Sequence, residues 1–326
     1  MPRRRSVFLL VGALLLSVVV GVGGWIYGIF HGLWPPPGTE LRTGIVFGRG
    51  GGQELKLNFV RPKKAAGKMP VLLFIHGGGW RGGKKEEFHP FMFHFSRSGV
   101  FCATIDYRLS PAHRFPAQIE DVKCAVRWLR ANADRYQLDP ARIVAFGGSA
   151  GAHLAALLAV TEGRPELEGT GGNPTESSAI RAAICLAGPY DLTLGYRSSV
   201  RQRQAEGDAV RQLLPALLGG TPDEMPDIYR WASPITYASA DSPPMLLVHG
   251  TADPLVLLEQ AEVFTKRLRE AGAPVQFLPL PEGTHTSFGK DANQAVKTIV
   301  SYALQQLGVP PAKSANEAKE TSPDPP

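Results

Sequence analysis

Ser149 lies in a glycine-rich hexapeptide, Phe-Gly-Gly-Ser-Ala-Gly, whose residue types suit a nucleophile. The apolar run at residues 143–146 predicts a buried strand before it, and the small residues at 150–159 predict a helix after it. Gly147 and Gly151 have no Cβ, so the strand and the helix can approach closely while the serine is held exposed in a strained turn. The helix N-terminus would direct backbone amides at developing negative charge. The pattern by itself also fits a phosphate-binding or purely structural turn.

His285 is the candidate base for this serine, because a serine hydroxyl needs a neighbouring group that takes its proton. It lies in the loop after the last predicted strand, residues 275–280. Loops that follow parallel strands meet at one edge of the sheet, and Ser149 also follows such a strand. Among the other histidines, His153 is expected to point along its own helix, and His249 is expected to pack in a turn.

Asp253 is the candidate carboxylate that would fix the tautomer of His285 and stabilise its charged form. It follows the predicted strand at residues 245–248, so it reaches the same edge of the sheet. Two other carboxylates compete with it. Glu282 is very close to His285 in sequence, and Asp291 is expected to begin a helix. Asp253 precedes a proline, so a plain turn residue is the structural alternative.

Three backbone amides are candidates for an oxyanion hole. A run of three glycines in His-Gly-Gly-Gly-Trp follows the predicted strand at residues 71–75 and lets the chain turn its amides toward a ligand. Gly78 and Gly79, together with Ala150 after the serine, are the expected donors. Taken alone, the glycine run could be a flexible loop.

Strand-like and helix-like segments alternate along the chain, which predicts an α/β fold with a mostly parallel sheet covered by helices. The expected strands are 55–60 (at a sheet edge), 71–75, 100–107, 143–146, 179–187, 245–248 and 275–280, and the expected helices are 86–98, 119–131, 150–159, 257–271 and 292–307. The segment 188–242 interrupts this alternation and predicts a small cap over the site. Its amphipathic run around Leu213 could equally be a helix packed on the flank.

The two ends of the chain differ from its body. Residues 7–30 carry no charge and follow three arginines, which predicts a membrane anchor with the remainder of the chain outside the cytoplasm. A cleaved signal peptide is the alternative. The anchor or signal segment and a proline-rich linker together make up residues 1–38. The expected catalytic domain covers residues 39–309. The polar, proline-rich tail at 310–326 predicts disorder.

Composition excludes several classes of protein. Half of the formal charge of +6 comes from the three N-terminal arginines, so the body has no basic concentration that would indicate nucleic-acid binding. The three cysteines, Cys102, Cys124 and Cys185, fall in predicted strands and a helix without metal-like spacing. They are expected to be buried thiols, and no metal or organic cofactor is expected.

These motifs together resemble the hormone-sensitive-lipase-like branch of the α/β-hydrolase esterases, over about residues 55–307. The resemblance also rests on the segments DYRLSP from Asp106, FPAQIEDV from Phe115, LEGTGGNP from Leu167 and HGTADPLV from His249. The later segments are most similar to the bacterial feruloyl and acetyl-xylan esterases. Gly148 and Ala152 depart from the hormone-sensitive-lipase pattern, which usually has an acidic residue and a glycine there.

The residues and the resemblance together predict a serine carboxylic-ester hydrolase with an α/β-hydrolase fold. The chain order Ser149, Asp253, His285 is the order of the triad in that fold. Short acyl or aromatic esters, such as those of carbohydrates, are the expected substrates. An amidase or peptidase with the same triad, and a non-catalytic binding domain on the same scaffold, are the alternatives.

Overall fold

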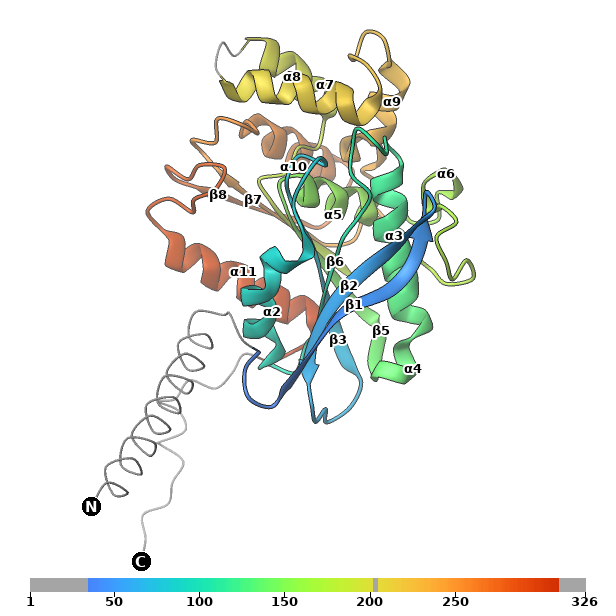
Figure 1. Ribbon diagram of the computed structural model, residues 1–326. Coiled ribbons are helices and arrows are strands. Elements are labelled where there is room, and N and C mark those ends of the chain that lie inside the picture. Colours follow the sequence, from blue (N-terminus) through green and yellow to red (C-terminus); the bar gives the residue numbers. More distant parts are fainter. Residues whose placement is uncertain (1–34, 202–204, 311–326) are drawn as a thin grey trace, which may run out of the picture.

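The structure is a computed structural model that describes residues 35–201 and 205–310. A mixed eight-stranded sheet forms the centre of this part of the chain (Figure 1). Its strand order is β1-β2-β4-β3-β5-β6-β7-β8. The strands are β1 (Thr39–Gly50), β2 (Gln53–Pro62), β3 (Met69–Ile75), β4 (Phe101–Ile105), β5 (Leu138–Gly148), β6 (Ala182–Leu186), β7 (Met245–Gly250) and β8 (Val275–Leu280). β1 and β2 are antiparallel, whereas the six strands from β3 to β8 run parallel.

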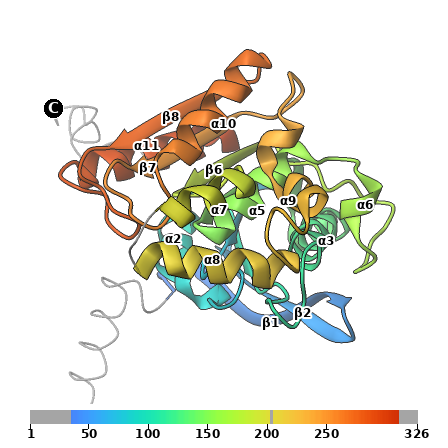
Figure 2. The ribbon, with the colours of Figure 1, turned by 90° about the horizontal axis from the view of Figure 1, so that it is seen from above.

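Helices cover both faces of this sheet, as the alternation of segments predicted (Figures 1 and 2). One core cluster includes residues of α3 (Ala117–Ala131), α5 (Ala150–Val160) and α10 (Glu259–Glu270). The other includes residues of α2 (His89–Ser96) and α11 (Ala292–Leu307). Every residue of β3 and β4 is buried, which explains why these strands are continuous apolar runs rather than alternating ones.

Two sequence predictions about the sheet and its helices were wrong in detail. The predicted edge strand is β2, but β1 lies outside it at the edge of the sheet. β1 has mostly exposed or half-exposed residues and two register shifts against β2, so its sequence shows no clear alternation. The helix expected at 86–98 is divided into a short 3-10 helix, η1 (Lys85–Phe88), and α2. Pro90 stands in the first turn of α2, where a missing amide costs nothing.

The described residues of the insertion between β6 and β7 form three α-helices and a further 3-10 helix. They are α7 (Leu192–Arg201), α8 (Ala205–Leu218), α9 (Pro226–Ala232) and η2 (Pro234–Tyr237). α7 and α8 lie next to each other above the sheet edge at which the parallel strands end, as the view from above shows (Figure 2). Shorter helices α4 (Ala133–Tyr136) and α6 (Pro165–Glu168) complete the described elements.

Both ends of the described body lie at the opposite sheet edge, where the parallel strands begin. Arg142, near the start of β5, donates from Nη1 to the carbonyl of Leu307 at the end of α11 (3.0 Å). The amide of Lys63 donates to the carbonyl of Gly38, just before β1 (2.8 Å). Because β2 runs against β4, this contact is also at the amino edge of the parallel strands.

Several predictions concern residues outside the described ranges. The anchor or signal at residues 7–30 and nearly all of the tail at 310–326 lie there and stay predictions. Among the described residues, no helix combines the length and apolar character that a membrane crossing requires. The three cysteines are buried free thiols, which confirms that prediction.

Candidate active site

Ser149 occupies a strained turn between β5 and α5. Its φ and ψ are 54° and −120°, a backbone conformation that costs an ordinary residue free energy and is found mainly where function requires it. A Cβ on Gly147 would lie 2.1 Å from the carbonyl oxygen of Gly151, and a Cβ on Gly151 would lie 2.0 Å from that of Ile75. The close approach that the sequence predicted for these glycines is therefore confirmed.

The structure brings Ser149, His285 and Asp253 together from the ends of three strands. His285 Nε2 lies 2.9 Å from Ser149 Oγ, and His285 Nδ1 lies 2.8 Å from Asp253 Oδ2. A carboxylate can only accept, so Nδ1 carries the proton and Nε2 is free to accept from the hydroxyl. The rival carboxylate Glu282 is instead paired with Lys290 on the surface.

Asp253 is held as a charged group by its surroundings. Its Oδ1 accepts from the amides of Leu255 (2.9 Å) and Val256 (3.0 Å). Burial alone would raise the pKa of Asp253, but hydrogen bonds from His249 and His285 outweigh it and hold that pKa well below its usual range. The carboxylate is therefore ionised at neutral pH.

His249 is a site residue whose role the sequence reasoning missed. Its buried imidazole donates from Nε2 to the carbonyl of Val256 (2.7 Å), and the same atom lies 3.4 Å from Asp253 Oδ2. The expected turn packing is thus part of its role, but it also touches the carboxylate. The spacing of four residues between His249 and Asp253 across a strand end was the available signal.

The glycine loop after β3 lies beside Ser149 and has the backbone that glycine favours. Gly78 and Gly79 have φ values of 100° and 58°. Within the described residues, neither amide donates to a protein acceptor. Ala150 is the first residue of α5, before the first intrahelical donor at His153, so its amide also has no intrahelical acceptor. All three predicted donors line the same pocket as Ser149 and His285.

Trp80 fixes the end of this loop against two helices. Its Nε1 donates to Nδ1 of His153 (3.2 Å), and Nε2 of His153 donates to the carbonyl of Ala232 in α9 (2.7 Å). Complete burial lowers the pKa of His153 to about 4, so the imidazole is neutral near neutral pH and can accept from the indole. His153 therefore links the loop to the insertion and lies away from the serine hydroxyl.

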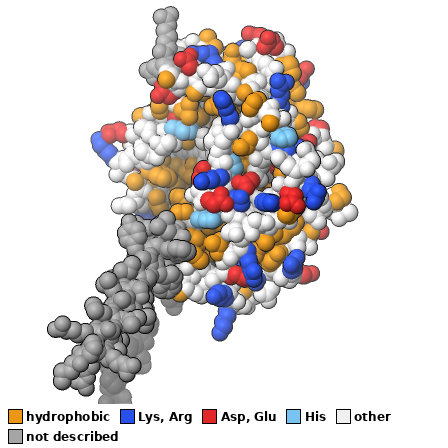
Figure 3. All heavy atoms as spheres, viewed as in Figure 1, with side chains coloured by type: hydrophobic (Ala, Val, Ile, Leu, Met, Phe, Trp, Pro, Cys, Tyr) orange, Lys and Arg blue, Asp and Glu red, His pale blue; other side chains and the backbone are white. Residues whose placement is uncertain are grey.

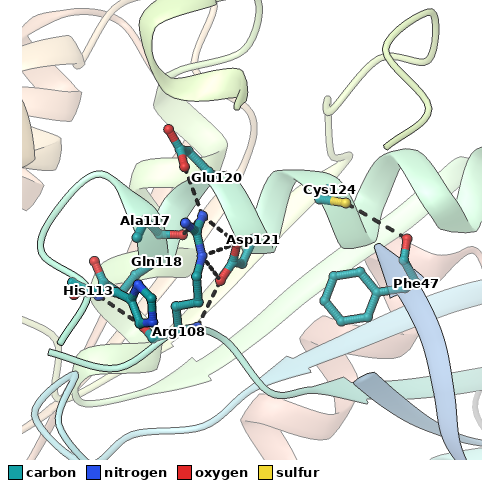
Figure 4. A network of polar contacts seen from close by, with 8 residues as sticks. All are labelled: Phe47, Arg108, His113, Ala117, Gln118, Glu120, Asp121 and Cys124. Atoms are coloured by element: carbon teal, nitrogen blue, oxygen red, sulfur yellow. Dashed lines mark hydrogen bonds and ion pairs between the residues drawn. The ribbon is translucent and has the colours of Figure 1, made fainter. Parts of the chain in front are cut away.

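An ionic network centred on Arg108 holds the loop that follows β4 (Figure 4). This loop in turn contacts the glycine loop. The Arg108 side chain, 10% exposed, binds Asp121 of α3 through Nε and Nη2 and reaches Glu120 (2.8 Å). Two residues later in the loop, Ser110 donates from its amide to the carbonyl of Trp80 (2.8 Å). The amide of Phe115 then donates to the carbonyl of Leu217 in α8 (3.0 Å), so one loop contacts both the glycine loop and the insertion.

Ser149 opens into a pocket of about 740 Å³. Its walls include Trp80 and Phe88 from the body, Leu213 and Leu214 from α8, and Phe288 from the loop that carries His285. Hydrophobic side chains also gather in the hollow visible on one face of the molecule (Figure 3). The insertion thus supplies part of the pocket wall. No group of side chains that could hold a metal ion is found among the described residues.

Comparison with known proteins places the chain in a family. The family described as BD-FAE matches residues 57–268, a range that includes Ser149 and Asp253. The chain belongs to the BD-FAE family. A second family, described as TAP-like protein, matches residues 229–316, which include His285. Membership of BD-FAE and the sheet topology together identify an α/β-hydrolase fold, as the sequence predicted.

The relatives of this BD-FAE protein include named esterases. Esterase LipQ of Mycobacterium tuberculosis is 36% identical over 84% of this chain and 64% of its own length, and the probable carboxylic ester hydrolase LipM of that organism is 34% identical over 75% and 57%. The chain thus spans less than two thirds of either relative.

Solved structures resemble the protein over most of both chains. A truncated carbohydrate esterase from gut microbiota has a TM-score of 0.72 and 26% identity, over 84% of this chain and 99% of its own. An esterase from Thermogutta terrifontis has a TM-score of 0.67 and 30% identity, over 86% and 97%.

Proposed function

We propose that the protein is a serine carboxylic-ester hydrolase that works through an acyl-enzyme. The observation that carries the proposal is the position of His285, whose two ring nitrogens lie within hydrogen-bond distance of Ser149 Oγ and Asp253 Oδ2. A hydroxyl, an imidazole and a buried carboxylate in this order are what nucleophilic attack on a carbonyl requires. The esterase names of the relatives support the same reaction.

The first half of the reaction acylates Ser149. Its Oγ attacks the ester carbonyl carbon while His285 Nε2 takes the hydroxyl proton. The negative charge moves to the carbonyl oxygen, which the amides of Gly78, Gly79 and Ala150 can receive because no protein acceptor competes for the two glycine amides. The carbon–oxygen bond to the alcohol then breaks, and His285 gives its proton to the leaving oxygen.

The second half repeats these steps with water. His285 Nε2 removes a proton from water, the hydroxide oxygen attacks the acyl carbon, and the proton returns to Ser149 Oγ as the acid leaves. Asp253 keeps its charge throughout and stabilises the imidazolium that forms in each half. Every step uses side chains and amides of this chain together with water.

The pocket bears on the acyl groups that the enzyme would accept. A volume of about 740 Å³ is within the range of pockets that enclose a whole small molecule, and it far exceeds the size of an acetyl group. Leu213, Leu214 and Phe88 in its walls favour an aromatic or alkyl group over a sugar ring. Of the expected substrates, aromatic esters therefore fit this pocket better than acetylated carbohydrates.

Labelling with a fluorophosphonate and hydrolysis of p-nitrophenyl acetate test the proposal on the full chain. We expect the wild type to be labelled and to release p-nitrophenol, and Ser149→Ala to lose both. Ser177→Ala is the matched control, because Ser177 is an exposed serine away from the pocket. Labelling of Ser149→Ala at the wild-type level would refute the assignment.

A further inference from the structure

A second cavity lies between α2 and α11, beside the active-site pocket. Its volume is about 250 Å³. Phe91 and Phe95 of α2 form one wall, and Val296 and Ile299 of α11 form the other. Phe146 of β5, three residues before Ser149, also lines it. The cavity therefore reaches the strand that carries the nucleophile from the sheet face that α2 and α11 cover.

Two phenylalanines line both the second cavity and the active-site pocket. Phe91 and Phe288 line both spaces, and Phe288 lies three residues after His285 in the same loop. The Phe91 ring lies 6.2 Å from the ring of Phe146, between centroids. The two spaces are thus neighbours that share these two aromatic side chains.

The second cavity is apolar from its floor to its mouth. Phe95, Phe146 and Ile299 at the floor are buried, whereas Phe91 and Val296 at the mouth are 41% and 40% exposed. His94 also lines it, and burial together with the nearby Arg97 lowers the pKa of His94, so this side chain is uncharged at neutral pH. Such a lining offers a hydroxyl-rich sugar almost no hydrogen bonds, but it can remove a hydrocarbon chain from water.

We propose that the cavity between α2 and α11 is a subsite for the apolar chain of the ester substrate. The inference rests on the proposed ester hydrolysis. We assign part of the substrate to this cavity because the cavity shares Phe91 and Phe288 with the active-site pocket. A chain attached to the reacting carbonyl at Ser149 passes Phe91 and Phe288 and ends against Phe146 and Ile299. The acid and the alcohol can each carry such a hydrocarbon chain, and the two arms of the experiment below distinguish them.

The subsite makes chain length a determinant of the rate. Each methylene that the cavity removes from water raises kcat/KM by up to about fourfold, until the cavity is full. We expect the full-length protein to hydrolyse p-nitrophenyl octanoate and decanoate with higher kcat/KM than the acetate. In the alcohol arm, octyl acetate is compared with ethyl acetate through release of acid.

Val296 offers the sharpest variants, because it lines the second cavity and not the first. Val296→Asp places a charge at the mouth, and Val296→Trp fills it. Each variant is expected to lower the ratio of kcat/KM for the long-chain ester to kcat/KM for the short-chain ester by about tenfold. This change is expected in the acid arm or in the alcohol arm, according to which part of the substrate places its hydrocarbon chain in the cavity. Val46→Asp is the matched control, since Val46 is equally exposed (41%) on the edge strand β1 and lines neither space.

A binding measurement separates failure of the subsite from failure of the proposed function. Sodium decanoate is titrated into the full-length protein, and its binding is measured by calorimetry. This measurement does not depend on hydrolysis of any ester. We expect binding that Val296→Asp and Val296→Trp weaken and Val46→Asp does not. Decanoate binding that is absent, or equal in all four proteins, overturns the subsite even if acetate is hydrolysed. Binding with this pattern but no hydrolysis of any ester refutes the catalytic proposal and leaves the subsite standing.

Discussion

His249 Nε2 lies 3.4 Å from Asp253 Oδ2, the same oxygen that accepts the His285 Nδ1 proton at 2.8 Å. The carboxylate is thus contacted by two imidazoles, one that faces the serine and one that is fully buried behind it. His249 does not reach the reacting atoms, so it acts as a positioning residue through Asp253.

Replacing His249 should slow the chemical step without weakening substrate binding. We expect His249→Asn to lower kcat by about tenfold, because a hydrogen bond to a charged group is worth about 1.5 kcal/mol or more. KM should stay unchanged. Steady-state kinetics on p-nitrophenyl esters measures both values. An unchanged kcat with a raised KM would place His249 outside the proposed role.

Asp253→Asn should remove most of the activity while the fold is kept. An amide in place of the carboxylate favours the wrong tautomer of His285, and such a change costs about 10⁴ in kcat in a triad of the same geometry on an unrelated fold. His285→Ala should cost a similar factor or more. Because the two residues act as a unit, the double variant should be no worse than His285→Ala. Losses that multiply in the double variant would show that the two residues act separately.

Gly78 and Gly79 should differ in their tolerance of a methyl group. A Cβ on Gly78 would lie 2.4 Å from the carbonyl oxygen of Gly82, whereas one on Gly79 would meet the flexible end of Leu213 at 2.9 Å. Gly78→Ala must therefore move the backbone and should lower kcat by about 10²–10³, as loss of an oxyanion donor does. Gly79→Ala should lose less. Equal kcat values for the two variants would contradict this difference.

Replacing only one partner of the Arg108–Asp121 pair should destabilise the protein more than replacing both partners with apolar residues. Asp121→Ala leaves a buried guanidinium without its main partner, and we expect a loss of about 3–5 kcal/mol in the free energy of unfolding. The double variant Arg108→Leu with Asp121→Leu should lose less. Urea unfolding measures both. A double variant that is less stable than the single one would show that the pair itself is net stabilising.

His153 should make stability depend on pH below its ordinary pKa. Its folded-state pKa is about 4 and its ordinary value is 6.5, so the unfolded chain binds the extra proton between these values. Stability therefore falls as pH decreases from 6.5 to 4, by about 3 kcal/mol. His153→Phe should be less stable than wild type at neutral pH but should lack this part of the pH dependence. Parallel slopes for the two proteins in urea unfolding would exclude His153 as the cause.

The sequence predicted that the three candidate residues lie together because each of them follows a strand that is easy to find. Ser149, Asp253 and His285 each come soon after a fully or largely apolar run, and parallel strands end at one edge. The bounds of α11 were predicted to the residue, because apolar residues recur along its sequence with the period of a helix. The edge strand β1 was missed because its side chains are mostly in water.

The contacts behind the site could not be predicted, because they join residues far apart in sequence. Nothing near His153 indicates that its partner is Trp80, 73 positions earlier. The second cavity depends on how α2 packs beside α11, and a helix sequence shows only which face is apolar. Helical periodicity also could not tell a cap from a flank helix at Leu213, whereas the structure places that side chain in the pocket wall.

The contacts of Gly38 with Lys63 and of Leu307 with Arg142 place the two ends of the described body, residues 35 and 310, at the sheet edge opposite to the one that carries Ser149. A purification tag, a solid support or a fused domain joined directly at residue 35 or 310 would therefore start from the side of the body away from the pocket. Attachment at either of these two residues would leave the pocket directed toward the surrounding solution.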